Sequence, residues 1–205
     1  MATVRRADTS DLDRICRSLV RAFADDPLVR WMVPDDDAYL GHDGDAFFRL
    51  VSRRWFEVGE VWTTPDCVAA SVWGPPDPPG LPDTVSAELG ALYMGFDAAT
   101  QARMAAVSAA VGSHRPDGPY WYLQFLGTHP DWQRQGLGSA LLAPLRERCD
   151  TEGLGQYLET ATDDDIAYYR ARGFDVLESF DIHDTEDPGR APVTVTTMWR
   201  PPGRG

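Results

Sequence analysis

Hydrophobic and polar positions divide the chain into alternating helix-like and strand-like segments. Apolar residues at helical spacing predict an amphipathic helix from about Ser10 to Phe23, ended by the Asp-Asp-Pro sequence at 25–27. The same spacing predicts further helices at 43–58, at 84–111, from Ala140 onward, and at 163–172. Runs of apolar and β-branched residues predict strands at 3–6, 58–64, 67–73, 120–128, 155–160, 174–182 and 193–199. This order predicts an α/β domain with a mixed central sheet and helices on both faces.

The sequence LQFLGTHPDWQRQGLGSALL at 123–142 joins a strand to a helix through two glycines. Gly136 and Gly138 stand at the helix start, where a ligand's phosphates can approach a backbone that lacks Cβ atoms. Unpaired first-turn N–H groups and the positive end of the helix dipole then stabilise the charge. Arg134 adds a guanidinium nearby. The turn therefore predicts a site for a phosphorylated cofactor.

Two other phosphate-binding motifs fit this turn poorly. A dinucleotide-binding turn needs a third Gly or Ala, but Leu141 stands there. The residues 130–135 also lengthen the turn, although Glu159 imitates the acid expected about 20 residues on. A Walker loop needs a Lys, and all 19 basic residues of this chain are Arg.

The turn at 133–138 has the form Q-x-x-G-x-G, which resembles motif A of the Gcn5-related N-acetyltransferase (GNAT) superfamily. A second block, Leu-Glu-Thr at 158–160 followed by YYRARGF at 168–174, is similar to the other marker of the superfamily, a strand and a short helix ending in Tyr-x-x-x-Gly-Phe. The sequence FADDP at 23–27 and the helical Pro144 resemble the branch around puromycin N-acetyltransferase.

This resemblance implies acetyl-CoA as the cofactor and a fold in which the fourth and fifth strands, here 120–128 and 155–160, splay apart. The pyrophosphate would lie on the backbone N–H groups of 134–139, and the backbone of 126–128 would pair with the pantetheine arm. Asp165 stands where many relatives have an Asn that bonds the pantetheine, and an ionised Asp can only accept that bond. The cofactor-binding residues expected are Leu126, Gly127, Thr128, Arg134, Gln135, Gly136, Leu137, Gly138, Ser139 and Asp165.

The same resemblance assigns catalytic roles. Tyr169, four residues before Gly173, stands at the family's general acid, although the residue type also suits a buried packing role. Glu159 is the first candidate for the base, and alternation along its strand could equally turn it toward solvent or a structural Arg. The acceptor pocket is expected near the first two helices and the last strands, with Asp26, Trp31 and Trp73 as candidate substrate-binding residues.

Composition sets limits on the function. The 205 residues predict one domain, 1–205, and the family resemblance implies an acetyl-CoA-binding core at about 118–182. A net charge of −13 argues against nucleic acid and anionic membranes as partners; it suits a cationic amine, and equally it serves solubility. The three Cys and four His share no metal-ligand spacing, so no metal is expected. A reduced, cytoplasmic protein is the natural interpretation, and a homodimer stays open.

The sequence thus predicts an acetyl-CoA-dependent N-acetyltransferase that acts on a primary amine of a small molecule by direct transfer in a ternary complex. Two alternatives stay open: acetylation of a protein or peptide amine, and a non-catalytic acyl-CoA sensor. The helical region 84–111 and the Pro-rich loop 74–82 favour a small substrate, because both can close the acceptor side.

Overall fold

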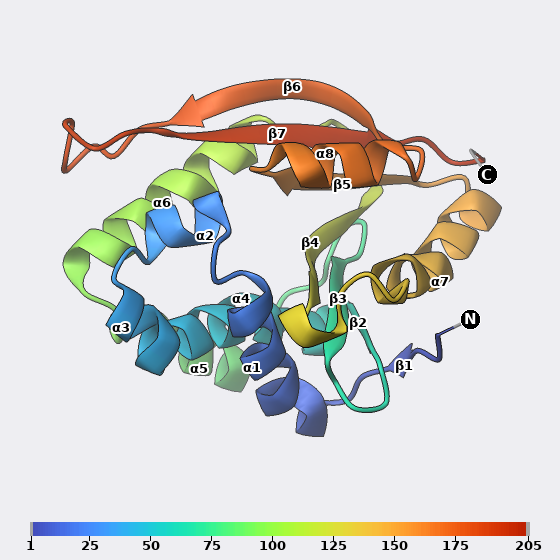
Figure 1. Ribbon diagram of the computed structural model, residues 1–205, viewed down its shortest axis with the longest axis horizontal. Helices are drawn as coiled ribbons and strands as arrows, with labels where there is room; N and C mark the ends of the chain where they lie inside the picture. The colour runs from blue at the N-terminus through green and yellow to red at the C-terminus, as the bar shows by residue number, and fades with distance from the viewer. Residues whose placement is uncertain (1, 204–205) are drawn as a thin grey trace.

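The predicted mixed sheet is present in the computed structural model, which describes residues 2–203 (Figure 1). Within these residues seven strands pair in the order β1-β2-β3-β4-β5-β7-β6, and β4 and β5 are the parallel pair. The strands are β1 (Arg5–Arg6), β2 (Glu60–Thr63), β3 (Ala69–Gly74), β4 (Tyr120–Thr128), β5 (Gly155–Thr160), β6 (Asp175–Ile182) and β7 (Val193–Arg200). The predicted fold class is confirmed.

Helices flank both faces of this sheet (Figure 1). The α-helices are α1 (Leu12–Ala22), α2 (Pro27–Met32), α3 (Asp36–Ala38), α4 (Gly44–Val58), α5 (Asp83–Met94), α6 (Ala98–Ser113), α7 (Leu137–Glu152) and α8 (Asp163–Arg170). A short 3-10 turn, η1 (Thr9–Asp11), precedes α1, and another, η3 (Pro130–Trp132), follows β4. A π-helical turn, η2 (Tyr39–Asp43), leads into α4.

The parallel pairing of β4 with β5 is short. It runs from Tyr120 opposite Gly155 to Leu123 opposite Leu158, whereas β4 continues to Thr128 and β5 to Thr160. Figure 1 shows β4 running steeply away from β5 below this point. The two strands therefore separate over their carboxyl-terminal halves, as the family resemblance implied.

Two hydrophobic clusters hold the layers together. The larger one joins α1, α2, α4 and α6 to one face of the sheet, with Ile15, Leu19, Phe48 and Val72 at full burial. The smaller one packs α7 and α8 on the opposite face; its members are Trp73, Trp121, Leu123, Leu142, Leu145, Cys149, Leu158, Tyr169, Phe174 and Met198. Each cluster reaches the point where β4 and β5 separate, so side chains of both line that region.

The structure departs from the predicted elements mainly between residues 27 and 43. The Asp-Pro pair that ends α1 also starts α2, because Asp26 accepts a hydrogen bond from the Val29 N–H (2.8 Å) and Pro27 takes the first helical position. The helical region 84–111 is divided into α5 and α6 by a turn at Gly95–Asp97, where the Asp97 side chain caps the second helix. The short elements between residues 27 and 43, which are α2, α3 and η2, lack the repeated apolar spacing that identifies longer helices.

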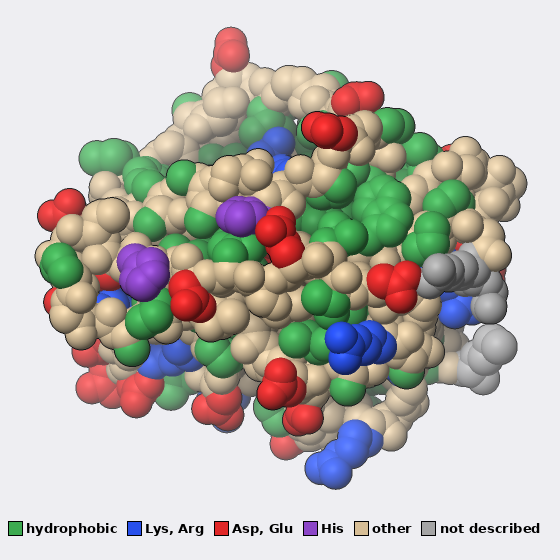
Figure 2. Space-filling view, turned by 90° about the horizontal axis from the view of Figure 1, so that it is seen from above, with side chains coloured by type: hydrophobic (Ala, Val, Ile, Leu, Met, Phe, Trp, Pro, Cys, Tyr) green, Lys and Arg blue, Asp and Glu red, His purple; other side chains and the backbone are tan. Residues whose placement is uncertain are grey.

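The surface over β6 and β7 carries acidic side chains spread among hydrophobic and polar ones (Figure 2). This distribution agrees with the net charge of −13. No helix within residues 2–203 is both long and apolar enough to span a bilayer.

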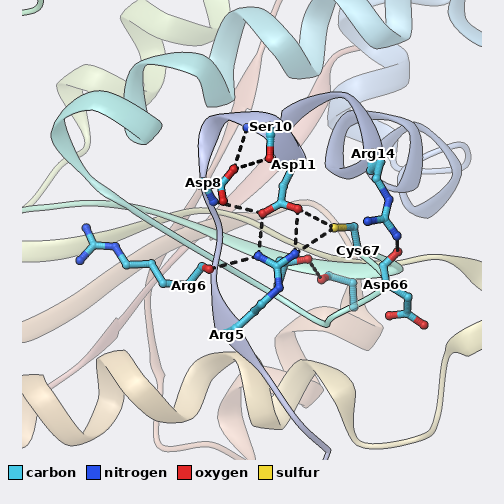
Figure 3. A network of polar contacts seen from close by, with 10 residues as sticks. Arg5, Arg6, Asp8, Ser10, Asp11, Arg14, Asp66 and Cys67 are labelled. Carbon is cyan, nitrogen blue, oxygen red and sulfur yellow. Dashed lines mark hydrogen bonds and ion pairs between the residues drawn. The ribbon is translucent and has the colours of Figure 1, made fainter.

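An ion pair at the start of the chain ties three segments together (Figure 3). Arg5 on β1 donates two hydrogen bonds to the Asp11 carboxylate (2.6 and 2.7 Å), and the Cys67 thiol in the β2–β3 turn donates to Asp11 Oδ1 (3.4 Å). The hydrogen bonds from Arg5 hold the pKa of Asp11 well below its usual value. Cys67 has a left-handed backbone with φ of 58°, so this contact also helps to hold a strained turn.

We expect Asp11→Asn to lower the free energy of unfolding by about 2 kcal/mol at neutral pH, since it weakens a charge-assisted pair on a buried carboxylate. Because the folded-state pKa of Asp11 is depressed, its stabilisation is present above the unfolded pKa and disappears as the pH falls. Denaturation curves of variant and wild type should therefore converge in acid. Asp66→Asn, in the same turn, is the control; an equal loss in both variants would contradict the assignment.

Candidate functional site

A cavity of about 490 Å³ lies where β4 and β5 separate. Its walls come from the C-cap of α1, from α2, α4, α5, α6 and α8, and from the two strands, and most of the lining residues are apolar. The apolar lining includes Phe23, Leu28, Val29, Met32, Phe47, Val51, Met104, Val107, Val111, Phe125 and Leu126. The charged, polar and amphipathic lining residues are Asp26, Tyr93, Ser108, Arg115, Tyr122, Gln124, Glu159, Thr160, Asp165 and Tyr169. Such a volume suits a small ligand, and these polar groups can orient it.

Tyr169 reaches the cavity from α8 and is buried. Its ring packs edge-on against Phe174, with centroids 5.5 Å apart. Burial raises the pKa of Tyr169 well above its ordinary value, and the nearby carboxyl of Asp165 raises it further. The hydroxyl therefore keeps its proton at neutral pH and can act as a donor.

Glu159 enters the cavity from β5. Burial raises its pKa to about 7, and the hydroxyls of Tyr122 and Tyr157 together with the charge of Arg115 moderate this rise. Its Oε1 atom is buried and has no hydrogen-bond partner among residues 2–203. A carboxyl group in this state can take up or release a proton near neutral pH.

Two aspartates add further carboxyl groups near Tyr169. Asp26 is the N-cap of α2, and burial raises its pKa to about 6. Asp165 accepts a hydrogen bond from the Thr162 hydroxyl (2.7 Å), while that hydroxyl oxygen accepts from the Asp165 N–H (3.1 Å). This reciprocal cap fixes the Asp165 side chain at the start of α8. The charge of Asp165 contributes to the raised pKa values of both Asp26 and Tyr169.

The glycine turn leads into α7 with the backbone geometry expected of an anion site. Gly136 is the N-cap of α7, in the left-handed region with φ of 79°, and it has no side chain to occupy the first-turn N–H groups. Arg134 is also left-handed, with φ of 59°. The segment 134–139, which the sequence predicted to bind a phosphate, also includes Gln135, Leu137 and Ser139.

Tyr168 and Arg172 support this turn, and the sequence did not identify them as site residues. A Cβ atom on Gly138 would lie 2.5 Å from the Tyr168 hydroxyl oxygen. Arg172 stacks 3.3 Å from the Tyr168 ring centroid and donates to Ser139 Oγ (2.7 Å). Tyr168 lies on α8 and Arg172 just after its end, four residues apart, so both side chains are on one face. This spacing could have identified the pair from the sequence.

The strand residues 126–128 lie beyond the last parallel pair of β4, on the segment that separates from β5. The space in front of Gly127 is filled by the protein itself, since a Cβ atom there would lie 2.6 Å from Leu19 Cδ2. The two tryptophans predicted to bind substrate do not line the cavity. Trp73 is fully buried and donates to Ser71 Oγ (3.0 Å), and Trp31 donates to the Ala191 carbonyl oxygen (3.1 Å).

Among residues 2–203, no three His, Cys, Asp or Glu side chains are close enough together to hold a metal ion.

The close contact between Gly138 and Tyr168 leads to a test. Gly138→Ala should lower the free energy of unfolding by about 1–2 kcal/mol, because the added methyl group displaces a buried ring. In a Tyr168→Phe background the cost should fall, since the next atom is 3.4 Å away. Denaturant titration of the two single variants and the double variant measures the coupling.

Gly90→Ala in α5, where a Cβ atom meets nothing within 4 Å, is the control and should be neutral or stabilising. Strict additivity of Gly138→Ala and Tyr168→Phe would refute the contact.

Comparisons with known proteins agree with this geometry. The model of the acetyltransferase (GNAT) family matches residues 76–174. A structure from Corynebacterium glutamicum, described as histone acetyltransferase HPA2 and related acetyltransferase, is 26% identical; the match covers 100% of this chain and 99% of that chain, with a TM-score of 0.69.

Two insect enzymes share the fold at lower identity. Arylalkylamine N-acetyltransferase 2 from Aedes aegypti is 11% identical, with 95% and 97% of the two chains covered and a TM-score of 0.67. Polyamine N-acetyltransferase from Drosophila melanogaster is 14% identical, with 97% and 99% covered and a TM-score of 0.60. The family model, the separated strands and the glycine turn agree, so this chain is similar to the GNAT family of N-acetyltransferases over residues 76–174 and shares its fold.

Proposed function

We propose that this protein transfers the acetyl group of acetyl-CoA to the primary amine of a small molecule, directly and within a ternary complex. The observation that carries the proposal is one cavity that holds both a buried carboxyl with a pKa of about 7, Glu159, and a buried phenol, Tyr169. These are the two proton-transfer groups that the reaction requires.

The residues of the chain fit acetyl-CoA, the cofactor that GNAT enzymes generally use. The left-handed Gly136 opens the start of α7 to a pyrophosphate, and the buried Tyr168 hydroxyl beside Gly138 has no hydrogen-bond partner within residues 2–203. The segment 126–128 of β4 has no parallel partner on β5 and can pair with pantetheine amides. When bound, acetyl-CoA would supply an acetyl thioester at the cavity.

The proton transfers follow from the two cavity groups. Glu159 would accept a proton from the incoming ammonium, so that the neutral amine can form the new C–N bond. Tyr169 would donate its hydroxyl proton to the sulfur that leaves as the C–S bond breaks, and the proton that the new amide nitrogen loses would restore the Tyr169 hydroxyl. A phenol has an ordinary pKa of about 10, so it can protonate a thiolate whose thiol has a pKa of about 8.5 only when the two groups are close together. Burial keeps the proton on the phenol until the thiolate forms.

A small acceptor is supported by the cover that α5 and α6 provide. Tyr93 of α5 and five residues of α6 contribute to the cavity wall: Met104, Ala105, Val107, Ser108 and Val111. The similar insect proteins are described as acting on small amines, and one of them forms N-acetylagmatine. The competing assignment is acetylation of a protein amine, which the description of the Corynebacterium structure favours.

An assay of CoA thiol release separates these alternatives. A panel of aminonucleosides, arylalkylamines, polyamines, amino acids and short peptides should give turnover with one class of small amine. Turnover with peptides alone would support the protein-acetylating alternative. Binding of acetyl-CoA with no turnover in any class would support a sensor.

Replacement of Tyr169 tests the general acid. Tyr169→Phe removes one hydroxyl from a packed ring, so kcat should fall by about tenfold or more while the affinity for acetyl-CoA stays nearly constant. Steady-state kinetics and calorimetry measure the two quantities, and the melting temperature verifies the fold. Unchanged kcat would remove Tyr169 from the mechanism.

The pH dependence tests the base. If Glu159 accepts the proton, kcat/KM should rise with pH through about 7 in the free enzyme, and this limb should disappear in Glu159→Gln. A limb near pH 6 that disappears in Asp26→Asn would assign the role to Asp26 instead.

The free energy of unfolding should fall as the pH rises, whereas kcat/KM should increase. The pKa of Glu159 is above its ordinary value of 4.5 in the fold, so the folded state favours the protonated carboxyl, and stability should decline as the pH rises from 4.5 through about 7. Glu159→Gln should therefore be at least as stable as the wild type above pH 7.

A further inference from the structure

Arg115 lines the cavity, and Arg54 is close enough to it for the two positive charges to interact. Arg115 follows α6 and lines the cavity, with its guanidinium carbon 4.6 Å from the centroid of the Tyr122 ring. Arg54 lies on α4, 4.3 Å from the centroid of the Trp55 ring. The indole N–H of Trp55 donates to Gln124 Oε1 (3.4 Å), and Gln124 also lines the cavity. Each guanidinium group therefore stacks on an aromatic ring; Arg115 lines the cavity, and Arg54 is connected to it through Trp55 and Gln124.

The neighbouring arginines show that this arrangement is unusual for the chain. Arg53 pairs with Glu57 (2.7 Å) and Glu88 (3.1 Å), and Arg49 pairs with Asp13 (2.8 Å) on the same helix. Within residues 2–203, neither Arg54 nor Arg115 forms an ion pair with a carboxylate. The chain has 32 acidic against 19 basic residues, so carboxylates are not scarce.

This arrangement costs free energy in the protein alone. Burial and the charge of Arg115 lower the pKa of Arg54. The Arg54 Nε atom is buried without a hydrogen-bond acceptor in the described part of the chain. Two like charges close together destabilise each other, and the buried Arg54 Nε donor is left unsatisfied among residues 2–203. An anion bound between them would relieve both penalties, and the planar guanidinium fork matches a carboxylate.

The other charged groups of the cavity define how such a ligand would lie. Glu159 is near enough to Arg115 for its charge to raise the pKa of that guanidinium, against the lowering effect of burial. The Oε1 atom of Glu159 is buried and unpartnered, so it can accept from an ammonium group. A ligand with adjacent positive and negative groups would thus satisfy Glu159 and the two arginines together, while the apolar walls contact the rest of it.

We infer that the acceptor is an amine that also carries a carboxylate, with an apolar body, and that Arg54 and Arg115 bind the carboxylate while Glu159 faces the amine. This inference rests on the proposed function for its reaction, and it goes beyond it in the class of acceptor. It disfavours a diamine, because a second cation would lie against the arginine pair.

Binding of a carboxylate that has no amine tests the site without the reaction. Calorimetry with 3-phenylpropionate should detect binding to the wild type, and 3-phenylpropionamide should bind about tenfold more weakly or worse. Arg115→Gln and Arg54→Gln should each lose about tenfold in affinity for the acid. Arg53→Gln, a neighbour with carboxylate partners, is the matched control and should bind it like the wild type. Equal binding of acid and amide, or no binding of either, would overturn the inference.

Thermal melting distinguishes a ligand site from a structural role. Because the two arginines repel each other, Arg54→Gln should leave the ligand-free melting temperature unchanged or higher, and it should abolish the rise that 3-phenylpropionate causes in the wild type. Arg54→Gln also carries the test alone if Arg115→Gln does not fold. A lower melting temperature with the ligand-dependent rise intact would refute the assignment.

Turnover then separates the inference from the proposed function. The kcat/KM for phenylalanine should exceed that for phenethylamine and for phenylalaninamide by about tenfold or more, and Arg115→Gln should remove this preference. Equal or better turnover of the two compounds without a carboxylate would overturn the inference and leave the proposed function standing. Absence of thiol release with every amine, while 3-phenylpropionate still binds at the arginines, would overturn the proposed function and leave the carboxylate site.

Discussion

The end of the parallel pairing between β4 and β5 is the constraint on which the rest of the site depends. After Leu123 and Leu158 the strands diverge, so the backbone of β4 up to Thr128 lacks a parallel neighbour and the side chains beneath it do not close into a continuous core. A continuous sheet would bury these backbone groups in hydrogen bonds. The interruption instead leaves backbone donors and acceptors for a ligand, beside a cavity that both hydrophobic clusters support.

Burial in that cavity determines the chemistry of the ionisable groups. The same apolar walls that exclude water raise the pKa values of Glu159, Asp26 and Tyr169, and thereby favour the neutral form of each. For Glu159 and Asp26 the result is a pKa of about 7 and about 6. Either carboxylate can therefore accept a proton from an ammonium group near neutral pH. For the phenol the result is a proton that is retained until a strong acceptor is formed. One physical cause, burial, thus gives Tyr169 and the two carboxyl groups the protonation behaviour that the proposed reaction requires.

Local patterns in the sequence were sufficient for the fold and for the glycine turn that leads into α7. The bounds of β4 and β5 were predicted to the residue, because each is an apolar run bounded by Gly, Pro or Thr. The glycine turn and the start of α7 followed from the residue types that a helix start and a left-handed backbone require. Contacts between distant segments were beyond such patterns. Trp31 and Trp73 had the right residue type for a pocket, yet the hydrogen bonds of their indole N–H groups belong to packing.

The net charge of the whole chain does not determine the electrostatic potential inside one cavity. A charge of −13 suggested a cationic substrate, and three carboxyl groups do line the cavity. The carboxyl groups nevertheless share that cavity with Arg115, and Arg54 lies close by, neither of them in an ion pair within the described residues. Spacing along α4 could not reveal this, because Arg49, Arg53 and Arg54 look alike in sequence and differ only in which side chains other elements bring to them. In the inferred binding mode, Arg115 and the carboxyl groups of the same cavity would together select a ligand that carries both charges.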